Sequence, residues 1–417
     1  MRCRQIPPFC LLSLVPFFVI RAQDPTFTKA FALYNAGSIT EAKSVLTSAL
    51  KAKPTALDYS LLGSIEIQQG DAASAERHLR AALDLQPGLS GTRYSLATLL
   101  EGTARPVEAK QQLEKVIAAD PKHAEALLSL ARLETADHQL ANSRNHLERA
   151  EKLLPKDQRP LLALARIENI NGRREAALAL ALKAKALAPD DPSVLYATGV
   201  LCMEMDLFND ANANLDKAAQ IEPDNPITLY ALASARVSKR DYPAAIKIFQ
   251  TLHNTNPADA QVAYALGATY YLEGDYPAAK TSLEKSIELR PAQVESYYYL
   301  GLIADHEGDI EKSVDLLKLV VNRQPSHAQG HIALGMEYRA LNQPDAAKRE
   351  LEIAVRLSPD SQKAHYQLGL VLGILQKTEE AHSELQIASR LRNSSDVNVN
   401  WELASPSSAA NAKKPRN

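Results

Sequence analysis

The chain has 417 residues, and its 47 Lys and Arg nearly balance its 49 Asp and Glu, which gives a formal net charge of −2. Good helix formers dominate and only 16 glycines are present, which favours a helix-rich protein. The charge balance argues against a nucleic-acid-binding protein, because such proteins usually carry a strongly basic face. Beyond the N-terminal segment only Cys202 remains of three cysteines, so we expect neither an internal disulfide nor a cysteine zinc site.

The first 22 residues have the pattern of a secretory signal. Arg2 and Arg4 precede an uncharged, mostly apolar stretch from Ile6 to Ile20, and Ala22 is the small residue before a cut. A membrane anchor is the alternative, but the stretch has 15 residues, three of them Pro, and a spanning helix needs about 20. The sequence therefore predicts a signal peptide cleaved near Ala22 and a chain exported to the periplasm, the outer membrane or the medium. Retention as an anchor stays open.

Prolines then recur with a period of 34 residues. The period is marked by Pro87, Pro121, Pro155, Pro189, Pro223, Pro257, Pro291, Pro325 and Pro359, and Pro54 precedes the first of these by 33 residues. Self-similarity at such a period is typical of stacked supersecondary units.

The same period carries a pattern of apolar and small residues. In the unit at 260–293, a Leu-Gly pair at Leu266 lies within a first helix, Ala279 marks one face of a second helix, and Pro291 ends it. Every unit from the second on has Leu at the first of these places except for Thr198, and has Gly or Ala directly after it.

This pattern resembles the tetratricopeptide repeat, which combines a Leu-Gly pair and a following Tyr on one helix with a small residue, a large apolar residue and a Pro on the next. The signature Trp of that family, three residues before the Leu, is missing throughout, and Arg93, His331 and His365 are among its replacements. The resemblance implies an all-α fold, an α-solenoid that forms a right-handed superhelix of about eleven helical hairpins. Each helix is marginal alone in water, so we expect stability to be shared between neighbours.

The predicted organisation has three parts: a signal peptide at 1–22, the array at 23–395, and a disordered C-terminal tail at 396–417. The hairpins are expected at 23–55, 56–89, 90–123, 124–157, 158–191, 192–225, 226–259, 260–293, 294–327, 328–361 and 362–395. The tail also allows an alternative, since four alternating apolar residues could fold back over the open end of the array: Val397, Val399, Trp401 and Leu403.

No pattern of catalytic chemistry is present. The chain has no Gly-rich phosphate loop, no HExxH and no GxSxG, so we predict that it is not an enzyme and holds no cofactor. His327, His331 and His365 could approach one another if adjacent units stack, but no carboxylate or cysteine completes a metal site. Half-buried packing is the preferred interpretation, and no metal is predicted. The family's clamp for a peptide carboxylate is also not expected, because its Asn, two residues before the Gly, is absent.

The resemblance implies a non-catalytic protein–protein interaction scaffold of the cell envelope or secretory space, which binds proteins or peptides in its concave groove. We expect a chain that is monomeric by itself, binds no nucleic acid and no evident small-molecule substrate, and allows peripheral association with a membrane complex. Two alternatives stay open. One is a structural spacer or assembly subunit of an envelope, secretion or polysaccharide-export complex without a peptide groove. The other is an accessory subunit that recruits substrates for an enzyme.

The first helices of such repeats line the concave face, and the second, fifth, ninth and twelfth positions of each unit are expected to point inward. The predicted binding residues are tyrosines and apolar side chains at these places: Tyr196, Tyr230, Tyr264, Tyr298, Met203, Val237, Tyr271 and Leu302. Tyr suits a binding surface because it combines wide apolar contact with a hydroxyl at low entropy cost. The alternative is that these tyrosines pack against the next hairpin.

A basic spot is the second candidate site. Arg132 and Arg166 share one position in the fourth and fifth units, and Arg159 lies two helical turns before Arg166. Together they could anchor an acidic group of a ligand. Local pairing with Glu125 or Glu168 is the alternative.

Overall fold

The computed structural model describes residues 25–392. Within this range every regular element is an α-helix, and the chain divides into two compact units, one up to Ala188 and one from Pro189. The predicted all-α fold of repeated helical hairpins is thereby confirmed. The predicted signal peptide and the C-terminal tail lie outside the described residues.

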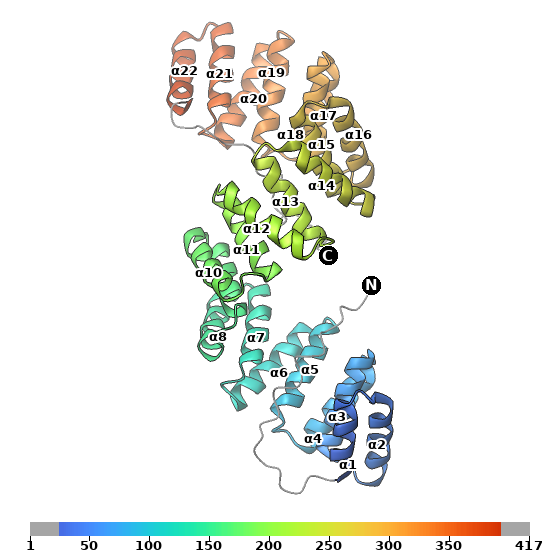
Figure 1. Cartoon of the computed structure of the whole chain (residues 1–417). Helices are drawn as coiled ribbons and strands as arrows, with labels where there is room; N and C mark the ends of the chain where they lie inside the picture. Colours follow the sequence, from blue (N-terminus) through green and yellow to red (C-terminus); the bar gives the residue numbers. More distant parts are fainter. Residues whose placement is uncertain (1–24, 393–417) are drawn as a thin grey trace. The chain divides into compact units, whose positions relative to one another are not determined.

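The first unit contains five helical hairpins (Figure 1). Its helices are α1 (Pro25–Asn35), α2 (Ile39–Ala52), α3 (Ala56–Gln69), α4 (Ala72–Leu85), α5 (Ser90–Gly102), α6 (Pro106–Ala119), α7 (Ala124–Ala136), α8 (Leu140–Leu153), α9 (Arg159–Ile170) and α10 (Arg174–Leu187). Each odd-numbered helix is the first helix of a hairpin and packs against the even-numbered second helix that follows it.

The second unit contains six further hairpins built in the same way. Its helices are α11 (Pro192–Glu204), α12 (Phe208–Ile221), α13 (Pro226–Ser238), α14 (Tyr242–Thr255), α15 (Ala260–Glu273), α16 (Tyr276–Leu289), α17 (Val294–His306), α18 (Ile310–Arg323), α19 (Ala328–Ala340), α20 (Pro344–Leu357), α21 (Gln362–Ile374) and α22 (Thr378–Arg392). No helix in the described range combines the length and the apolar character that crossing a membrane requires.

The two helices of a hairpin approach closely because one of them is small at the crossing point. A Cβ added at Gly267 on α15 would lie 2.7 Å from the Cγ of Leu283 on α16, and Gly199 and Gly335 meet a leucine in the same way. Leu283 is fully buried at this crossing. Burial of such a side chain contributes roughly 1.5–3 kcal/mol, so the crossing supplies much of what holds each hairpin closed.

The turn inside each hairpin contains one residue in the left-handed backbone region. Five turns use glycine there, at Gly37, Gly70, Gly172, Gly274 and Gly308. The other six place a residue with a Cβ at the same point, with φ between 56° and 61°: Ala104, His138, Asp206, Arg240, Asn342 and Gln376. This conformation costs an ordinary residue about 1 kcal/mol and is better tolerated by Asn and Asp, so the turn at Ala104 is strained relative to the glycine turns.

The periodic prolines end the second helices, and many of their carbonyl groups accept hydrogen bonds from basic side chains. The donors are Arg93 to Pro87 (2.7 Å), Arg149 to Pro121 (2.9 Å), Lys217 to Pro189 (3.0 Å), Arg323 to Pro291 (2.6 Å), His331 to Pro325 (3.1 Å) and His365 to Pro359 (2.9 Å). These carbonyl groups lie in the loop just beyond the negative end of each second helix, so a basic donor both satisfies the carbonyl oxygen and interacts favourably with the helix dipole.

Three of these donors stand where the resemblance leads one to expect Trp. Arg93, His331 and His365 each contact the proline carbonyl six residues before them and a side chain of the second helix nineteen residues after them. These second contacts join Arg93 to Gln112 at 3.0 Å, His331 to Glu350 at 2.7 Å and His365 to Glu384 at 2.6 Å. A polar side chain thus ties the inter-hairpin loop to the second helix.

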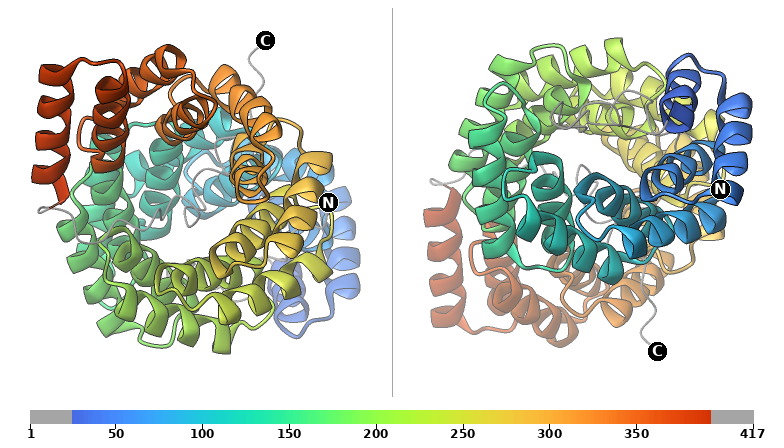
Figure 2. Two further views of the ribbon diagram at one scale, coloured as in Figure 1. Left: turned by 90° about the horizontal axis from the view of Figure 1, so that it is seen from above. Right: turned by 90° about the horizontal axis from the view of Figure 1, so that it is seen from below.

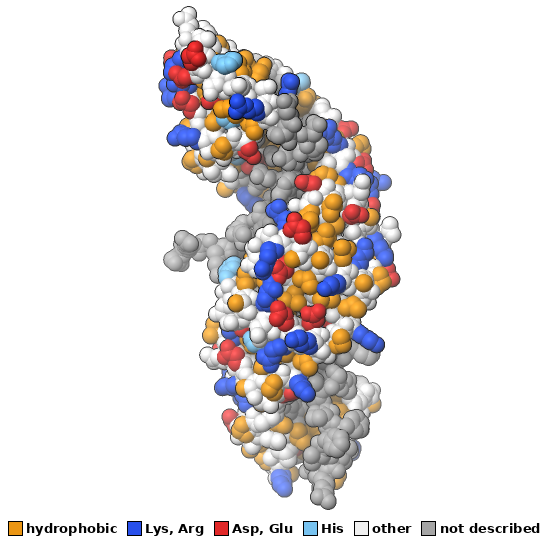
Figure 3. Space-filling model, turned by 90° about the vertical axis from the view of Figure 1, so that its left-hand side faces the viewer, with side chains coloured by type: hydrophobic (Ala, Val, Ile, Leu, Met, Phe, Trp, Pro, Cys, Tyr) orange, Lys and Arg blue, Asp and Glu red, His pale blue; other side chains and the backbone are white. Residues whose placement is uncertain are grey.

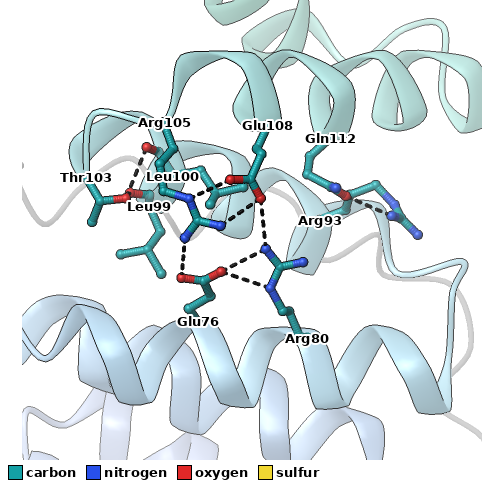
Figure 4. Close-up of polar contacts among 9 residues, drawn as sticks. All are labelled: Glu76, Arg80, Arg93, Leu99, Leu100, Thr103, Arg105, Glu108 and Gln112. Atoms are coloured by element: carbon teal, nitrogen blue, oxygen red, sulfur yellow. Dashed lines mark hydrogen bonds and ion pairs between the residues drawn. The ribbon is translucent and has the colours of Figure 1, made fainter.

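An ionic network joins the second and third hairpins (Figure 4). Arg105 donates to Glu76 at 2.7 Å and to Glu108 at 2.6 and 2.7 Å, while Arg80 donates to Glu76 at 2.7 and 2.9 Å. All four side chains are partly exposed, so each pair contributes modestly and the closed arrangement mainly fixes α4 against α6.

The backbone strain at the Ala104 turn can be measured as a change in the free energy of unfolding. Ala104→Gly should raise the free energy of unfolding of the chain by up to about 1 kcal/mol, because glycine adopts the left-handed conformation without steric conflict. Ala213→Gly, at an exposed place inside α12, is the matched control and should lower it by roughly 1 kcal/mol. Urea denaturation measures both. Equal destabilisation by the two substitutions would contradict the assignment of strain to Ala104.

Candidate binding face

Within each unit the first helices lie closer together than the second helices. First helices of successive hairpins contact one another, as α15 does with α17 and α19 with α21, whereas no two successive second helices in the described range make comparable contact. A stack that is tighter on one side curves toward that side. The first helices therefore line the inner face of each unit, and the curved course of the hairpins within a unit can be followed in Figure 2.

Five of the predicted binding residues are partly exposed on first helices of the second unit: Tyr196, Tyr230, Tyr271, Tyr298 and Leu302. They lie on the consecutive helices α11, α13, α15 and α17. Between them the face carries few charges, since the other partly or fully exposed inward positions of α11 and α13 hold Ser193, Val200 and Ile227. This row of tyrosines and apolar residues is called the tyrosine face below.

Three other predicted residues are buried instead. Only 5% of Tyr264, 4% of Met203 and 3% of Val237 is exposed. Tyr264 and Val237 belong to the same apolar cluster as Leu283, and the Tyr264 ring lies 6.2 Å from that of Tyr299 in the next hairpin. These three side chains fill the space between helices and offer almost no surface to a partner.

The tyrosine at the fifth position also links one hairpin to the next. The ring of Tyr298 lies 5.1 Å from that of His327, and Tyr94 lies 5.0 Å from His123 in the first unit. Both histidines cap the next first helix, because the Nδ1 of His327 accepts the amide of Gly330 at 2.8 Å and His123 caps α7 in the same way. The rings of Tyr298 and Tyr94 are thus held in place by packing against the next hairpin.

The tyrosine hydroxyls are strongly desolvated. Burial raises the pKa of Tyr230 to about 12, and its hydroxyl accepts a hydrogen bond from the amide of Gln261 at 3.2 Å. Burial also raises the pKa of Tyr298 far above its usual value, and it raises the pKa values of Tyr196 and Tyr271. At neutral pH all of them are uncharged phenols with apolar surroundings, which suits contact with an apolar partner.

Two of the three arginines of the predicted basic spot are engaged in ion pairs. Arg132 on α7 is exposed and pairs with Glu101, while Arg159 pairs with Glu125 and with Asp157, each at 2.6 Å. Arg166 on α9 is exposed and makes no ion pair or hydrogen bond with any residue in 25–392. The carboxylate of Glu168 is held by other arginines, namely Arg144 and Arg173.

One unusual residue near the tyrosine face was missed from the sequence. Glu337 on α19 occupies the tenth position of its unit, where the other units from the second on have Ala, Thr or an aliphatic residue. This difference in the sequence could have identified Glu337 as unusual. Only 4% of Glu337 is exposed, and no Lys or Arg of the described chain lies within ion-pair distance. Burial and the nearby carboxylate of Asp305 raise the pKa of Glu337 to about 7, against a smaller effect of the Ser313 hydroxyl.

The histidines considered for a metal site have protein partners. His327 caps α19 and its Nε2 lies 3.2 Å from Glu295, while His331 and His365 lie against glutamates of their own hairpins. Among residues 25–392 no three His, Cys, Asp or Glu side chains are placed to hold a metal ion. On the face shown in Figure 3, basic and acidic side chains are interspersed without a large area of one sign.

Comparison with known families decides what kind of array this is. Two family models, both described as tetratricopeptide repeat, match the chain, one at 66–133 and 203–268 and the other at 27–90, 264–328 and 332–404. The chain is a tetratricopeptide repeat protein. Tetratricopeptide repeats generally mediate protein–protein interactions, and proteins built from them are generally non-catalytic scaffolds.

Three solved structures illustrate the range of similar arrays. The crystal structure of MamA has 22% identity and a TM-score of 0.35, and the match covers 39% of this chain and 95% of MamA. The Cut9-Hcn1 hetero-tetramer of the APC/C has 16% identity and a TM-score of 0.47, with 90% and 94% covered. Pseudomonas aeruginosa pilF has 21% identity and a TM-score of 0.44, with 51% and 95% covered. Similarities at this level carry no information about the partner of this tetratricopeptide repeat chain. No curated protein matches it.

Matched substitutions can distinguish the tyrosines that pack in the core from those that are exposed, by their effect on the free energy of unfolding. Tyr264→Ala should lower the free energy of unfolding by roughly 3–5 kcal/mol, because it empties a buried site between two hairpins. Tyr366→Ala changes the same repeat position in the last hairpin, where the side chain is 44% exposed, and should have a much smaller effect. Thermal and chemical denaturation measure both variants. A mild effect of Tyr264→Ala would show that the tyrosine is not part of the core.

The buried carboxyl group of Glu337 should make stability depend on pH. A glutamate ionises near 4.5 in the unfolded chain and near 7 in the folded one, so between these values the folded state binds more protons. The free energy of unfolding should therefore fall as pH rises from about 4.5 to about 7. Glu337→Gln keeps the shape and removes this contribution. Denaturation curves of both proteins across this range test the point, and parallel pH profiles would contradict it.

Proposed function

We propose that this tetratricopeptide repeat protein is a non-catalytic scaffold of the cell envelope or secretory space that binds a segment of a partner protein along the tyrosine face. The observation that carries the proposal is the row of partly exposed, uncharged side chains on four consecutive first helices. Tyr196, Tyr230, Tyr271, Tyr298 and Leu302 form this row.

The physical properties of the row support binding. Tyrosine buries a large apolar area on contact and loses little conformational freedom, because only two side-chain torsions are involved. Packing against the next hairpin already restricts the rings of Tyr271 and Tyr298, so part of their entropy loss has occurred before a partner arrives. An extended segment or a helix with apolar side chains is the partner that such a face suits.

The ends of the face differ in charge, which suggests how a partner would be oriented. Hairpins six to eight carry no charged residue at their inward positions, whereas Glu295 and Asp305 occupy two such positions on α17. A partner segment with apolar residues followed by a basic group would match this order. In the first unit, Arg166 is exposed and available as a separate contact for an acidic group.

Export is the second part of the proposal. It is supported by the sequence of residues 1–22, in which two arginines precede a short apolar stretch that ends near Ala22. The partner would then be another protein of the periplasm, the outer membrane or the medium. N-terminal sequencing of the chain recovered outside the cytoplasm tests this, with Gln23 as the expected first residue. A chain that still begins at Met1 would contradict cleavage.

Site-specific photo-crosslinking in the producing cell tests the binding face. A photoreactive amino acid at Tyr196 or Leu302 should give covalent adducts with one partner protein. The same amino acid at Lys247 or Leu319, which are exposed on second helices, serves as the matched control and should give none. Adducts only from the control positions would instead support a spacer that docks through its second helices. Adducts from none of the four positions would also contradict the proposal.

A further inference from the structure

The last described hairpin leaves an apolar residue of its second helix uncovered. In every earlier hairpin the corresponding side chain is at most 1% exposed: Leu46, Leu79, Leu113, Leu147, Ala181, Leu215, Phe249, Leu283, Leu317 and Leu351. Leu385 on α22 occupies the same place and is partly exposed. It still packs on Gly369 of its own hairpin, because a Cβ there would lie 2.7 Å from the Leu385 Cγ. The uncovered side of Leu385 is the one that a following hairpin would contact.

The first helix of the same hairpin shows the same loss of cover. Tyr366 on α21 is 44% exposed, whereas the residues at the fifth position of the other described units are buried or half-buried. In the hairpin before it, Ile332 is completely buried at that place. Where a hairpin follows, the ring of such a tyrosine contacts the next helix, as Tyr298 contacts His327. Leu385 and Tyr366 together define an apolar end face of the array.

The sequence directly after α22 has the pattern of an amphipathic strand. Residues 397–403 alternate between apolar and polar, with Val397, Val399, Trp401 and Leu403 on one side and Asn398, Asn400 and Glu402 on the other. These residues lie outside the described range, and their alternation is a feature of the sequence. A segment of this kind has one apolar side to bury and one polar side to leave in water.

We propose that residues 397–403 of the chain cover the end face formed by Leu385 and Tyr366. The lengths agree, because α22 has 15 residues and is about 22 Å long at 1.5 Å per residue. Seven residues of extended chain span about 23 Å. The four residues from 393 to 396 bridge up to about 13 Å, which exceeds the diameter of a helix and permits the reversal of direction.

Residues 397–403 are favoured over a second copy of the chain as the cover of the end face because they are close to it in the sequence. A segment four residues from the end of α22 is present at the end face at a high effective concentration, whereas a second copy has to be recruited from solution. Repeat arrays also need a terminal element with a polar outer side to remain soluble, and the Asn and Glu residues of 397–403 supply such a side. The proposal is independent of the tyrosine face and of the partner.

Trp401 makes the proposal directly testable, because it is the only tryptophan of the chain. In the full-length protein its fluorescence should peak at a shorter wavelength than in the urea-unfolded chain and should resist quenching by iodide. Tyr366→Asp and Leu385→Glu should each shift the emission to longer wavelength and raise the quenching severalfold. Leu357→Glu, at a side chain of α20 that is 40% exposed, is the matched control and should change neither.

Several outcomes would overturn the proposal. One is a Trp401 in the unaltered protein that is quenched as readily as in urea, and another is protection that survives both end-face substitutions. Protection that disappears on dilution, together with a dimer in light scattering, would assign the end face to a second copy instead. Far-ultraviolet circular dichroism checks that the variants keep their helices. Tyr366→Asp is informative even if Leu385→Glu unfolds α22, because Tyr366 is already exposed.

Discussion

The structure depends on the close approach of two helices at one point in every hairpin. Where Gly267 faces Leu283, even a Cβ would lie 2.7 Å from the leucine Cγ and would displace it, and contacts of a small residue with a large one recur at the other crossings. Because the helices are only three to four turns long, neither would persist without this contact. The contact also fixes the orientation of the first helix. It therefore determines which of its side chains pack against neighbouring hairpins and which lie on the inner face.

Polar contacts fix the loops between hairpins, in addition to the apolar contacts within each hairpin. At six of the periodic prolines a basic side chain donates to the proline carbonyl, and at His331 and His365 one side chain joins that carbonyl to a glutamate of the second helix. A tryptophan at this place would fill space, whereas these residues fix the loop by directed hydrogen bonds. The chain thus keeps the packing of the repeat with a different chemistry at its entry loop.

The proline period and the Leu-Gly pattern were enough to predict the hairpins, because both follow from the geometry of the crossing and of the helix end. They were not enough to predict exposure on the inner face. Tyr264 and Tyr230 share one repeat position, yet Tyr264 is buried, and its helix α15 lies closer to the next first helix, α17, than α13 lies to α15. How near a neighbouring helix comes depends on several residues at once, and a single-position pattern does not contain that information.

Hydrogen exchange of the native protein tests the central claim, that stability is shared between hairpins through these crossings. Leu283→Ala should cost roughly 2–5 kcal/mol, and the control Leu319→Ala, at a side chain 39% exposed, should cost much less. The account predicts that Leu283→Ala lowers amide protection in α13 and α14 and in α17 and α18, as well as in its own hairpin. Loss of protection confined to α15 and α16 would contradict it.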